Sequence, residues 1–439
     1  MLELERWAVE ISNELEKTEA DTKTETERWR KSSIYKVPAS IADVNTKLYT
    51  PQMVSFGPYH HGRPHLIPME EHKRRALLQF LKRAKKPLKV FVEAVAEELQ
   101  CLKDCYYEIS ERWKQDDDGF VQLMILDGCF MLEILRVGND LIDDYAPDDP
   151  IFGNRGRYCV LPYIRVDMLM LENQLPLLVL YKMLAVESGE MDEEPINRLI
   201  LKFCFLVSPG VPIGNCLHAL DIYRKMQIFE FKTRKTDIVG RSSRLQFEYT
   251  DIDLSATDLY DSGIRFRKSK NVSISSISFR SGVLKLPAMV YDLQTERLML
   301  NLMAFEWCHS GISIEVTEYI CFMYYLIRSD RDVALLRSYG IIQNYLDSDR
   351  DVVLLLSSLS RNSVTEVDSK LNRVRLMVNG YCTRPWNKCR AYLVRNYFKS
   401  PWTAVNLIAA IILFLLTFAQ TVYTVYPYYH RNEPRPRTP

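Results

Sequence analysis

A cluster of histidines is the first feature of this sequence that could do chemistry. It lies in the segment YTPQMVSFGPYHHGRPHLIPMEEH and consists of His60, His61, His65 and His72. Imidazole rings bind metal ions and act as general acids and bases. However, no cysteine stands nearby at a ligand spacing, and the side chains of neighbouring residues in an extended chain point apart. We therefore predict no metal site, and expect the histidines to pack this loop onto a core and to hydrogen-bond to backbone.

Two carboxylates interrupt long apolar stretches. Asp127 lies in FVQLMILDGCFMLEILRVG, which is apolar nearly all round, and Glu172 lies in DMLMLENQLPLLVL. A buried carboxylate needs a partner or takes a raised pKa, so a structural role and a functional role are equally open for Asp127. We predict a buried polar network of His60, His61, Asp127 and Glu172. If these groups converge on a closed pocket, they indicate chemistry; if they are paired and buried, they indicate a binding module.

The motifs of well-known enzyme classes are missing from the sequence. There is no Gly-rich phosphate loop, no G-x-S-x-G elbow, no H-E-x-x-H, no kinase motif set and no dinucleotide fingerprint. We therefore predict no catalytic residues, no cofactor and no metal, and expect a protein that is not an enzyme. The formal net charge is +1, with 57 basic and 56 acidic residues. This balance lacks the basic excess of a nucleic-acid-binding protein.

The elements that would position these residues are mostly helices. Hydrophobic periodicity predicts helices from residue 69 onward and at 90–113, 120–138, 163–184 with a kink before Pro176, 196–207, 216–232, 295–308 and 364–381. A short repeat, SDRDVALL and SDRDVVLL, predicts two capped helix starts at Ser329 and Ser348.

A small β element is expected at about residues 244–292. LQFEY, VSISSISF and VLKLPAMVYD favour strands, and Ser281-Gly282 separates the last two as in a hairpin. A helical insert, SATDLYDSG, lies between the first two. The fold class is therefore mostly α with a minor β-sheet (α+β), in one large domain at residues 34–383. Residues 1–33 are expected to form a charged helix and a linker.

The C-terminal region predicts a membrane anchor. From Trp402 to Tyr426 no side chain is charged, and at 1.5 Å per residue this length crosses a hydrocarbon core of about 30 Å. Trp402 and Tyr426 stand where aromatic rings meet the headgroups. The N-terminus shows no signal peptide, so we expect a tail anchor with the large domain in the cytosol and a short tail at 427–439. The plasma membrane is favoured over endomembranes.

A basic helix is expected directly before the span, at residues 384–401. Its cations are Lys388, Arg390, Arg395 and Lys399. Each could contact anionic lipid for about 1 kcal/mol, although an ordinary solvated helix face has the same pattern.

Several long motifs of this chain resemble one plant family. They are IYKVP, YTPQMVSFGPYHHG, MEEHKRRAL, DGCFMLEIL, DMLMLENQLPLLVL, ATDLYDSGIRF, LKLPAMVYD, NLMAFE and the C-terminal YFKSPWTAVNLIAAIILFLLTFAQTVY. In this order they resemble the family called domain of unknown function 247, over roughly residues 34–428. The resemblance implies a plant membrane protein with a large helical domain and no assigned activity or catalytic residues. Some members of the family are linked to self-incompatibility in grasses.

The hypothesis for function follows from these observations. We expect a membrane-anchored recognition or signalling protein that acts through protein–protein contacts, in plant cell communication including self-incompatibility. Its expected partners are membrane lipid and an unidentified protein. The alternatives are a membrane-bound enzyme of unknown reaction and a structural adaptor that binds lipid.

Overall fold

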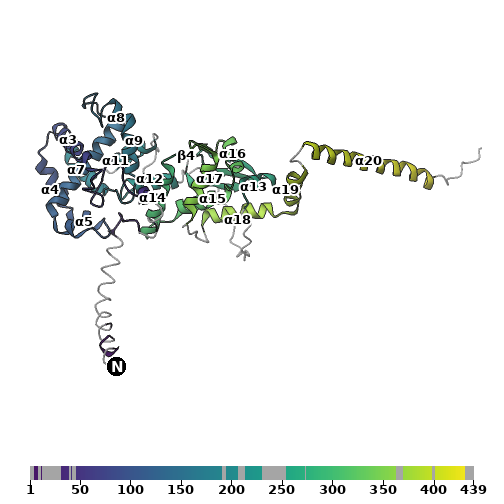
Figure 1. Ribbon diagram of the computed structural model, residues 1–439, viewed down its shortest axis with the longest axis horizontal. Coiled ribbons are helices and arrows are strands. Elements are labelled where there is room, and N and C mark those ends of the chain that lie inside the picture. The colour runs from purple at the N-terminus through teal and green to yellow at the C-terminus, as the bar shows by residue number, and fades with distance from the viewer. Residues whose placement is uncertain are drawn as a thin grey trace, which may run out of the picture.

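The protein is an elongated helical body from which one long helix projects (Figure 1). The computed structural model describes residues 4–7, 11, 31–38, 41, 46–189, 194–205, 213–229, 254–271, 273–361, 369–397 and 401–430. The predicted class, mostly α with a minor β-sheet, is confirmed. Most of the expected N-terminal helix and linker, the expected strand LQFEY and Lys399 lie outside the described residues.

The first half of the body is built around one buried helix, α7. Its residues are apolar on nearly every face, and it contacts α3, α4, α6, α10 and α11. The elements of this half are η1 (Thr46–Leu48), α3 (Ile67–Ala84), α4 (Leu88–Ala96), α5 (Leu99–Asp104), α6 (Glu111–Gln115), α7 (Asp117–Gly138), α8 (Asn154–Cys159), α9 (Leu161–Asp167), α10 (Leu177–Ser188), α11 (Glu194–Phe205) and α12 (Ala219–Ile228). The expected core helix at 120–138 is confirmed.

Two expected helices of this half are broken. The single helix expected at 90–113 is three short helices, α4, α5 and α6. The chain turns after Cys105 because the Cys105 carbonyl accepts from the N–H of Ile34 and the Tyr107 N–H donates to the Ile34 carbonyl. The helix expected at 163–184 is not merely kinked, since residues 168–176 leave the helix between α9 and α10. Polar side chains in this segment and next to it form hydrogen bonds with the backbone of the segment itself. They also form hydrogen bonds with the backbone of residues far away in the sequence.

The second half adds the small sheets. Its elements are α13 (Ala256–Asp261), β1 (Arg265–Lys268), η2 (Ile274–Ser276), β2 (Ser278–Arg280), β3 (Val283–Leu286), β4 (Met289–Tyr291), α14 (Thr295–Cys308), α15 (Glu315–Leu326), α16 (Asp330–Ser338), β5 (Ile342–Asn344), α17 (Asp349–Ser360) and α18 (Lys370–Cys382). The helix expected at 295–308 and the helical insert are confirmed.

In the part of the chain that the structure describes, the β element is more divided than expected. One sheet has the order β1-β3-β2, with β1 parallel and β2 antiparallel to β3, and a second pairs β4 with β5 in parallel. The turn at Ser281-Gly282 is confirmed, with both residues at positive φ (51° and 78°). VLKLPAMVYD is not one strand, because Pro287 has no N–H to donate and separates β3 from β4. In VSISSISF only the last residues are strand.

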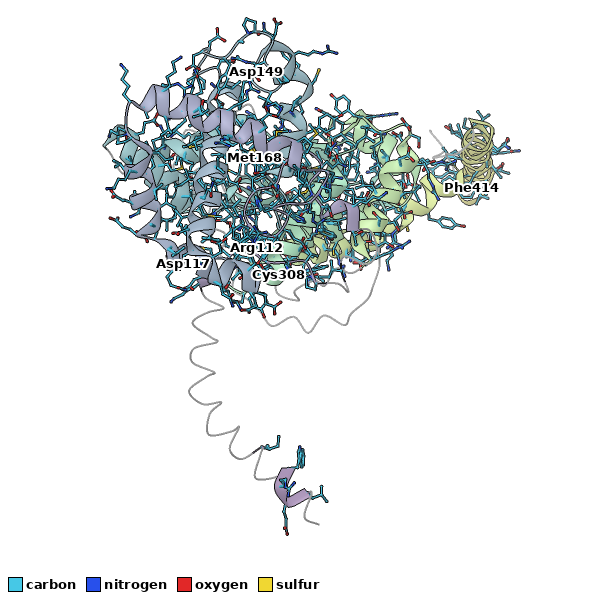
Figure 2. The ribbon with its side chains drawn as sticks, turned by 60° about the vertical axis from the view of Figure 1, so that its left-hand side comes forward. Arg112, Asp117, Asp149, Met168, Cys308 and Phe414 are labelled. Atoms are coloured by element: carbon cyan, nitrogen blue, oxygen red, sulfur yellow. The ribbon has the colours of Figure 1, made fainter. Side chains whose placement is uncertain are left out.

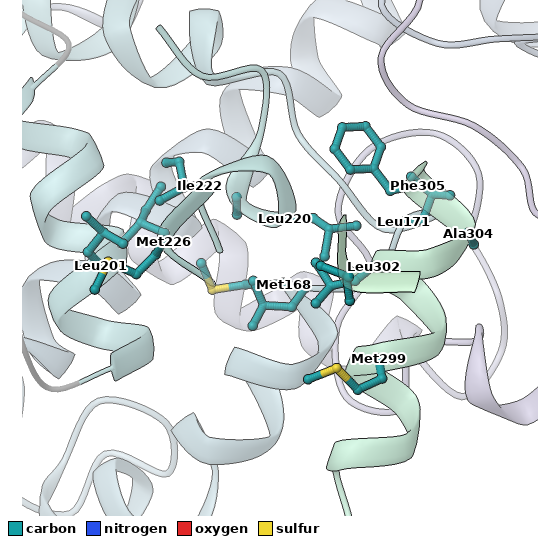
Figure 3. Close-up of a cluster of buried hydrophobic side chains, with 14 of the residues drawn as sticks. Met168, Leu171, Leu201, Leu220, Ile222, Met226, Met299, Leu302, Ala304 and Phe305 are labelled. Atoms are coloured by element: carbon teal, nitrogen blue, oxygen red, sulfur yellow. The ribbon is translucent and has the colours of Figure 1, made fainter. Parts of the chain in front are cut away.

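One hydrophobic core joins the two halves. Figure 3 shows Met168, from the turn after α9, in a cluster with Leu220 of α12 and with Leu302 and Phe305 of α14. Asn301 of α14 adds a polar link, since its Oδ1 accepts from the Leu171 N–H at 2.9 Å. The halves therefore form one body.

The two SDRD repeats are capped helix starts, as predicted. Ser329 before α16 forms a capping box with Asp332, and Ser348 before α17 forms one with Asp351. In each box the serine side chain faces the N–H three residues ahead, and the aspartate accepts from the serine N–H.

The C-terminal helices are α19 (Pro385–Tyr397) and α20 (Pro401–His430). Within α20, Ile408–Tyr426 is long and apolar enough to cross a membrane, with a mean hydropathy of 2.1 and no residue buried against the body. Figure 2 shows Phe414 of this helix standing apart from the body. Lys388 and Arg390 are exposed on α19, and Tyr426 is 63% exposed. The side chains of Arg395 and Trp402 lie outside what the structure describes.

Candidate functional site

A loop at residues 52–57, buried from residue 54 onward, lies at the centre of the polar network. Its backbone belongs to no helix or strand, so its N–H groups need other acceptors. The carboxylate of Asp167, at the end of α9, accepts from the N–H groups of Gln52, Met53 and Val54 at 3.0, 2.6 and 3.0 Å. Asp167 is 1% exposed, and burial raises its pKa while the three N–H donors oppose the rise. One side chain thus holds the first half of the loop.

Asn173 and Asp127 hold the second half of this loop. Asn173 accepts from the Phe56 N–H at 2.7 Å and donates to the Val54 carbonyl at 3.0 Å. Asp127 Oδ2 accepts from the Gly57 N–H at 2.7 Å. Gly57 has a φ of 70°, and a Cβ there would lie 2.6 Å from the Tyr106 hydroxyl. Only glycine fits this turn.

Lys73 of α3 lies beneath the same loop. Its ammonium is 2.6 Å from Asp127 Oδ1, 2.7 Å from Glu70 Oε1 and 2.7 Å from the Ser55 carbonyl oxygen. The side chains of Lys73 and Asp127 are fully buried. Burial raises the pKa of Asp127 to about 6, although the charge of Lys73 acts in the opposite direction. The lysine is therefore a structural cation that holds α3, α7 and the loop together.

His60 and Glu172 form a second, separate pair. His60 Nε2 lies 3.1 Å from Glu172 Oε2, and Glu172 Oε1 accepts from the Val37 N–H at 2.8 Å. Burial lowers the pKa of His60, although its hydrogen bond to Glu172 opposes this.

The predicted network is therefore not a single cluster: Asp127 pairs with Lys73 under the loop of residues 52–57, and His60 pairs with Glu172 elsewhere. His61 belongs to neither pair, because its half-buried ring meets Trp113 edge-on at 5.5 Å. His65 donates to the Pro51 carbonyl at 3.1 Å, and His72 Nδ1 accepts from Arg75 at 2.7 Å. Among the described residues no three His, Cys, Asp or Glu side chains are placed to hold a metal ion.

The sequence interpretation missed Lys73, Asp167 and Asn173. Lys73 could have been found, since it occupies an apolar-stripe position of α3, between Met69 and Ala76. Asp167 and Asn173 interrupt the same apolar run as Glu172. Nothing in their spacing shows that they hold a loop more than 100 residues earlier.

An open apolar groove lies beside this loop, between α3, α4 and α7. Its volume is about 890 Å³. Leu78, Leu88 and Val92 are exposed by 63%, 40% and 36% at its rim. Its apolar lining is Leu77, Leu78, Leu81, Leu88, Val92, Ala96, Val121, Ile125 and Leu126.

Charged residues line part of the groove. They are Glu70, Glu71 and Arg74 of α3 and Asp118 of α7. Glu70 also contacts Lys73, so it connects the groove to the buried pair under the loop. Within the described residues, Glu71, Arg74 and Asp118 make no ion pair.

The fold and site together define a class of protein: a helical body with a buried structural polar network, an open apolar groove and a C-terminal helix able to span a membrane. The chain belongs to the plant protein family of unknown function called domain of unknown function 247, which matches residues 34–416.

Two proteins of Arabidopsis thaliana are similar over most of their length. UPF0481 protein At3g47200 is 32% identical over 425 residues, covering 90% of this chain and 86% of the relative. A second UPF0481 protein, At3g02645, is 23% identical over 516 residues, covering 94% of each. No solved structure matches the chain.

Proposed function

We propose that this protein is a membrane-held binding module whose groove between α3, α4 and α7 contacts a partner protein. One contrast carries the proposal. The titratable groups Lys73, Asp127, His60 and Glu172 are buried or half-buried and lie in ion pairs, and three of them, Lys73, Asp127 and Glu172, also bond to backbone, whereas the large hollow beside them is apolar and open. Open apolar surfaces rimmed by polar groups are typical of protein contacts.

Binding fits this arrangement better than catalysis. A catalytic acid or base must reach a reacting atom, within about 3 Å or through one water. Asp127 and Lys73 are fully buried and face the backbone of residues 55 and 57. We therefore also propose that the protein is not an enzyme.

The proposed anchor is α20, with the body in the cytosol and the plasma membrane as the site of action. Anchoring is supported by the uncovered apolar length of Ile408–Tyr426. Lipid contact by the basic helix α19 is supported by the exposure of Lys388 and Arg390. Plant cell communication, including self-incompatibility, is the process in which such a module would act.

Site-specific photo-crosslinking tests the groove. A benzoylphenylalanine is placed at Leu78 in the full-length chain in plant membranes, and at Leu293, which is 84% exposed, as a matched control. We expect a protein adduct from position 78 that is absent from position 293 and is lost when Val92→Glu is added. Equal adducts from both positions, or none from position 78, would refute the proposal.

A further inference from the structure

The groove is lined only by helices. Its lining residues recur every three or four positions on each helix, as at Leu88, Val92 and Ala96 of α4. Such rows make a channel along the helix axes, suited to a rod-shaped ligand. Because the rim residue Leu78 remains 63% exposed, the channel is too open to enclose most of a small molecule, as ligand pockets do.

The backbone of the groove cannot pair with an extended peptide. The N–H and C=O groups of α3, α4 and α7 are bonded within their own helices. An extended segment on this apolar floor would leave its own backbone groups unpaired, at a cost of about 1–3 kcal/mol for each one buried. The backbone groups of a helical ligand are already hydrogen-bonded within the helix, so helix-in-groove binding is favoured.

The charges that line the groove indicate which charge its ligand should carry. Three carboxylates, Glu70, Glu71 and Asp118, line the groove together with one guanidinium, that of Arg74. Glu70 is already paired with Lys73, whereas Glu71 and Asp118 have no ion pair among the described residues. A basic side chain on the ligand would complement them.

We propose that the groove receives an amphipathic α-helix of a partner protein, with apolar residues at i, i+3 or i+4, and i+7 and a lysine or arginine that reaches Glu71 and Asp118. This inference rests on the proposed function and names the partner's chemistry. The chain's own segment at residues 2–19 has the apolar spacing but carries six glutamates against two basic residues, Arg6 and Lys17. Its net charge is therefore negative, like that of the groove, so the two would repel each other.

A display experiment tests this inference. The full-length chain in phospholipid nanodiscs selects from a library of 16-residue helices with randomised faces, after depletion on the Leu78→Glu variant. We expect enriched helices with the apolar spacing and a lysine or arginine at one end. Their dissociation constants should rise at least tenfold with Leu78→Glu and stay within twofold with the matched control Leu293→Glu. Glu71→Lys with Asp118→Lys should shift the preference to acidic ends.

Each other outcome contradicts the inference. If no helix is enriched in a groove-dependent way, the proposal that the groove receives a helix is refuted. If the enriched helices lack basic residues, the proposed charge of the ligand is refuted. Tighter binding by a chain that lacks residues 1–30 would show that the chain's own segment occupies the groove. If photo-crosslinks form at position 78 while no helix is enriched, the proposed function stands and only this inference fails.

Discussion

The ammonium of Lys73 lies 2.6 Å from the carboxylate of Asp127, and neither side chain is exposed to solvent. The pair joins α3 to α7, and both partners also bond to the backbone of residues 52–57. Transfer of two charges from water is costly, so such a pair contributes less to stability than its geometry suggests, but removal of one partner is severe. The main role of the pair is therefore to allow the loop to pack against α3 and α7, which requires both partners.

Replacement of the lysine alone should destabilise the protein. Lys73→Met leaves Asp127 buried without its cation, so the carboxyl must either stay charged without a partner or take up a proton, and we expect a loss of about 3–5 kcal/mol in the free energy of unfolding. The double variant with Asp127→Asn keeps an acceptor for the Gly57 N–H and carries no charge, so it should recover much of the loss. Urea unfolding of the full chain in micelles measures both. Equal losses in the single and double variants would show that charge is not the cause.

His218 should make stability depend on pH. This buried ring accepts the Asp221 N–H at Nδ1 (3.2 Å) and donates from Nε2 to the Ser33 carbonyl (3.0 Å), so both nitrogens are used by the neutral form. Burial lowers its pKa from 6.5 to about 4. Between these pH values the unfolded chain binds a proton that the folded chain does not, so stability is full above pH 6.5 and falls as the pH drops to 4, by about 3 kcal/mol.

The matched variant for this effect is His218→Asn, which keeps a capping side chain but does not titrate. The stability difference between the native chain and His218→Asn should shrink as the pH falls from 6.5 to 4. Thermal unfolding at several pH values measures it. A difference that stays constant across this range would assign the pH dependence to other groups.

The two repeated capping boxes should differ in strength. Among the described residues, Asp351 bonds only within its own box, to the N–H and hydroxyl of Ser348. Asp332 also accepts from the N–H and hydroxyl of Thr257 on α13, both at 2.8 Å. We expect Asp351→Ala to cost about 1 kcal/mol and Asp332→Ala about 2–3 kcal/mol, measured by urea unfolding. Equal costs would mean that the contact with α13 contributes nothing.

Charges placed in α20 should abolish membrane retention. Leu413 and Leu416 are 64% and 61% exposed in the apolar stretch. Leu413→Arg with Leu416→Arg adds about 2.5–3.5 kcal/mol per arginine to the cost of insertion. The fraction of the protein that remains in the membranes after carbonate extraction should fall to that of a soluble protein. The control Leu293→Arg, on the body, should leave this fraction unchanged. Full retention of the double variant would show that α20 is not the anchor.

The parts of the fold set by local sequence could be predicted. α7, α14, the turn at Ser281-Gly282 and the capped starts of α16 and α17 follow from nearby residues. The breaks after Cys105 and Asp167 could not, because the competing hydrogen bonds come from Ile34 and from residues 52–54, far away along the chain.

The candidate site was only partly predictable for the same reason. Asp127, His60 and Glu172 could be recognised as buried polar groups because they interrupt apolar surroundings. Lys73 was missed, since a lysine on an amphipathic helix is ordinarily solvated. The groove could not be predicted, because it exists only once α3, α4 and α7 are placed side by side.

The elongated body separates its two ends. The groove helices α3, α4 and α7 lie at the end farthest from α19 and α20 (Figure 1). If α20 spans a membrane as proposed, a ligand for the groove can approach from bulk solvent without colliding with the headgroups. A partner rooted in the same bilayer would need a stalk as tall as this body, whereas a freely diffusing partner needs none. The shape thus favours capture of freely diffusing proteins over lateral association between neighbours in the membrane.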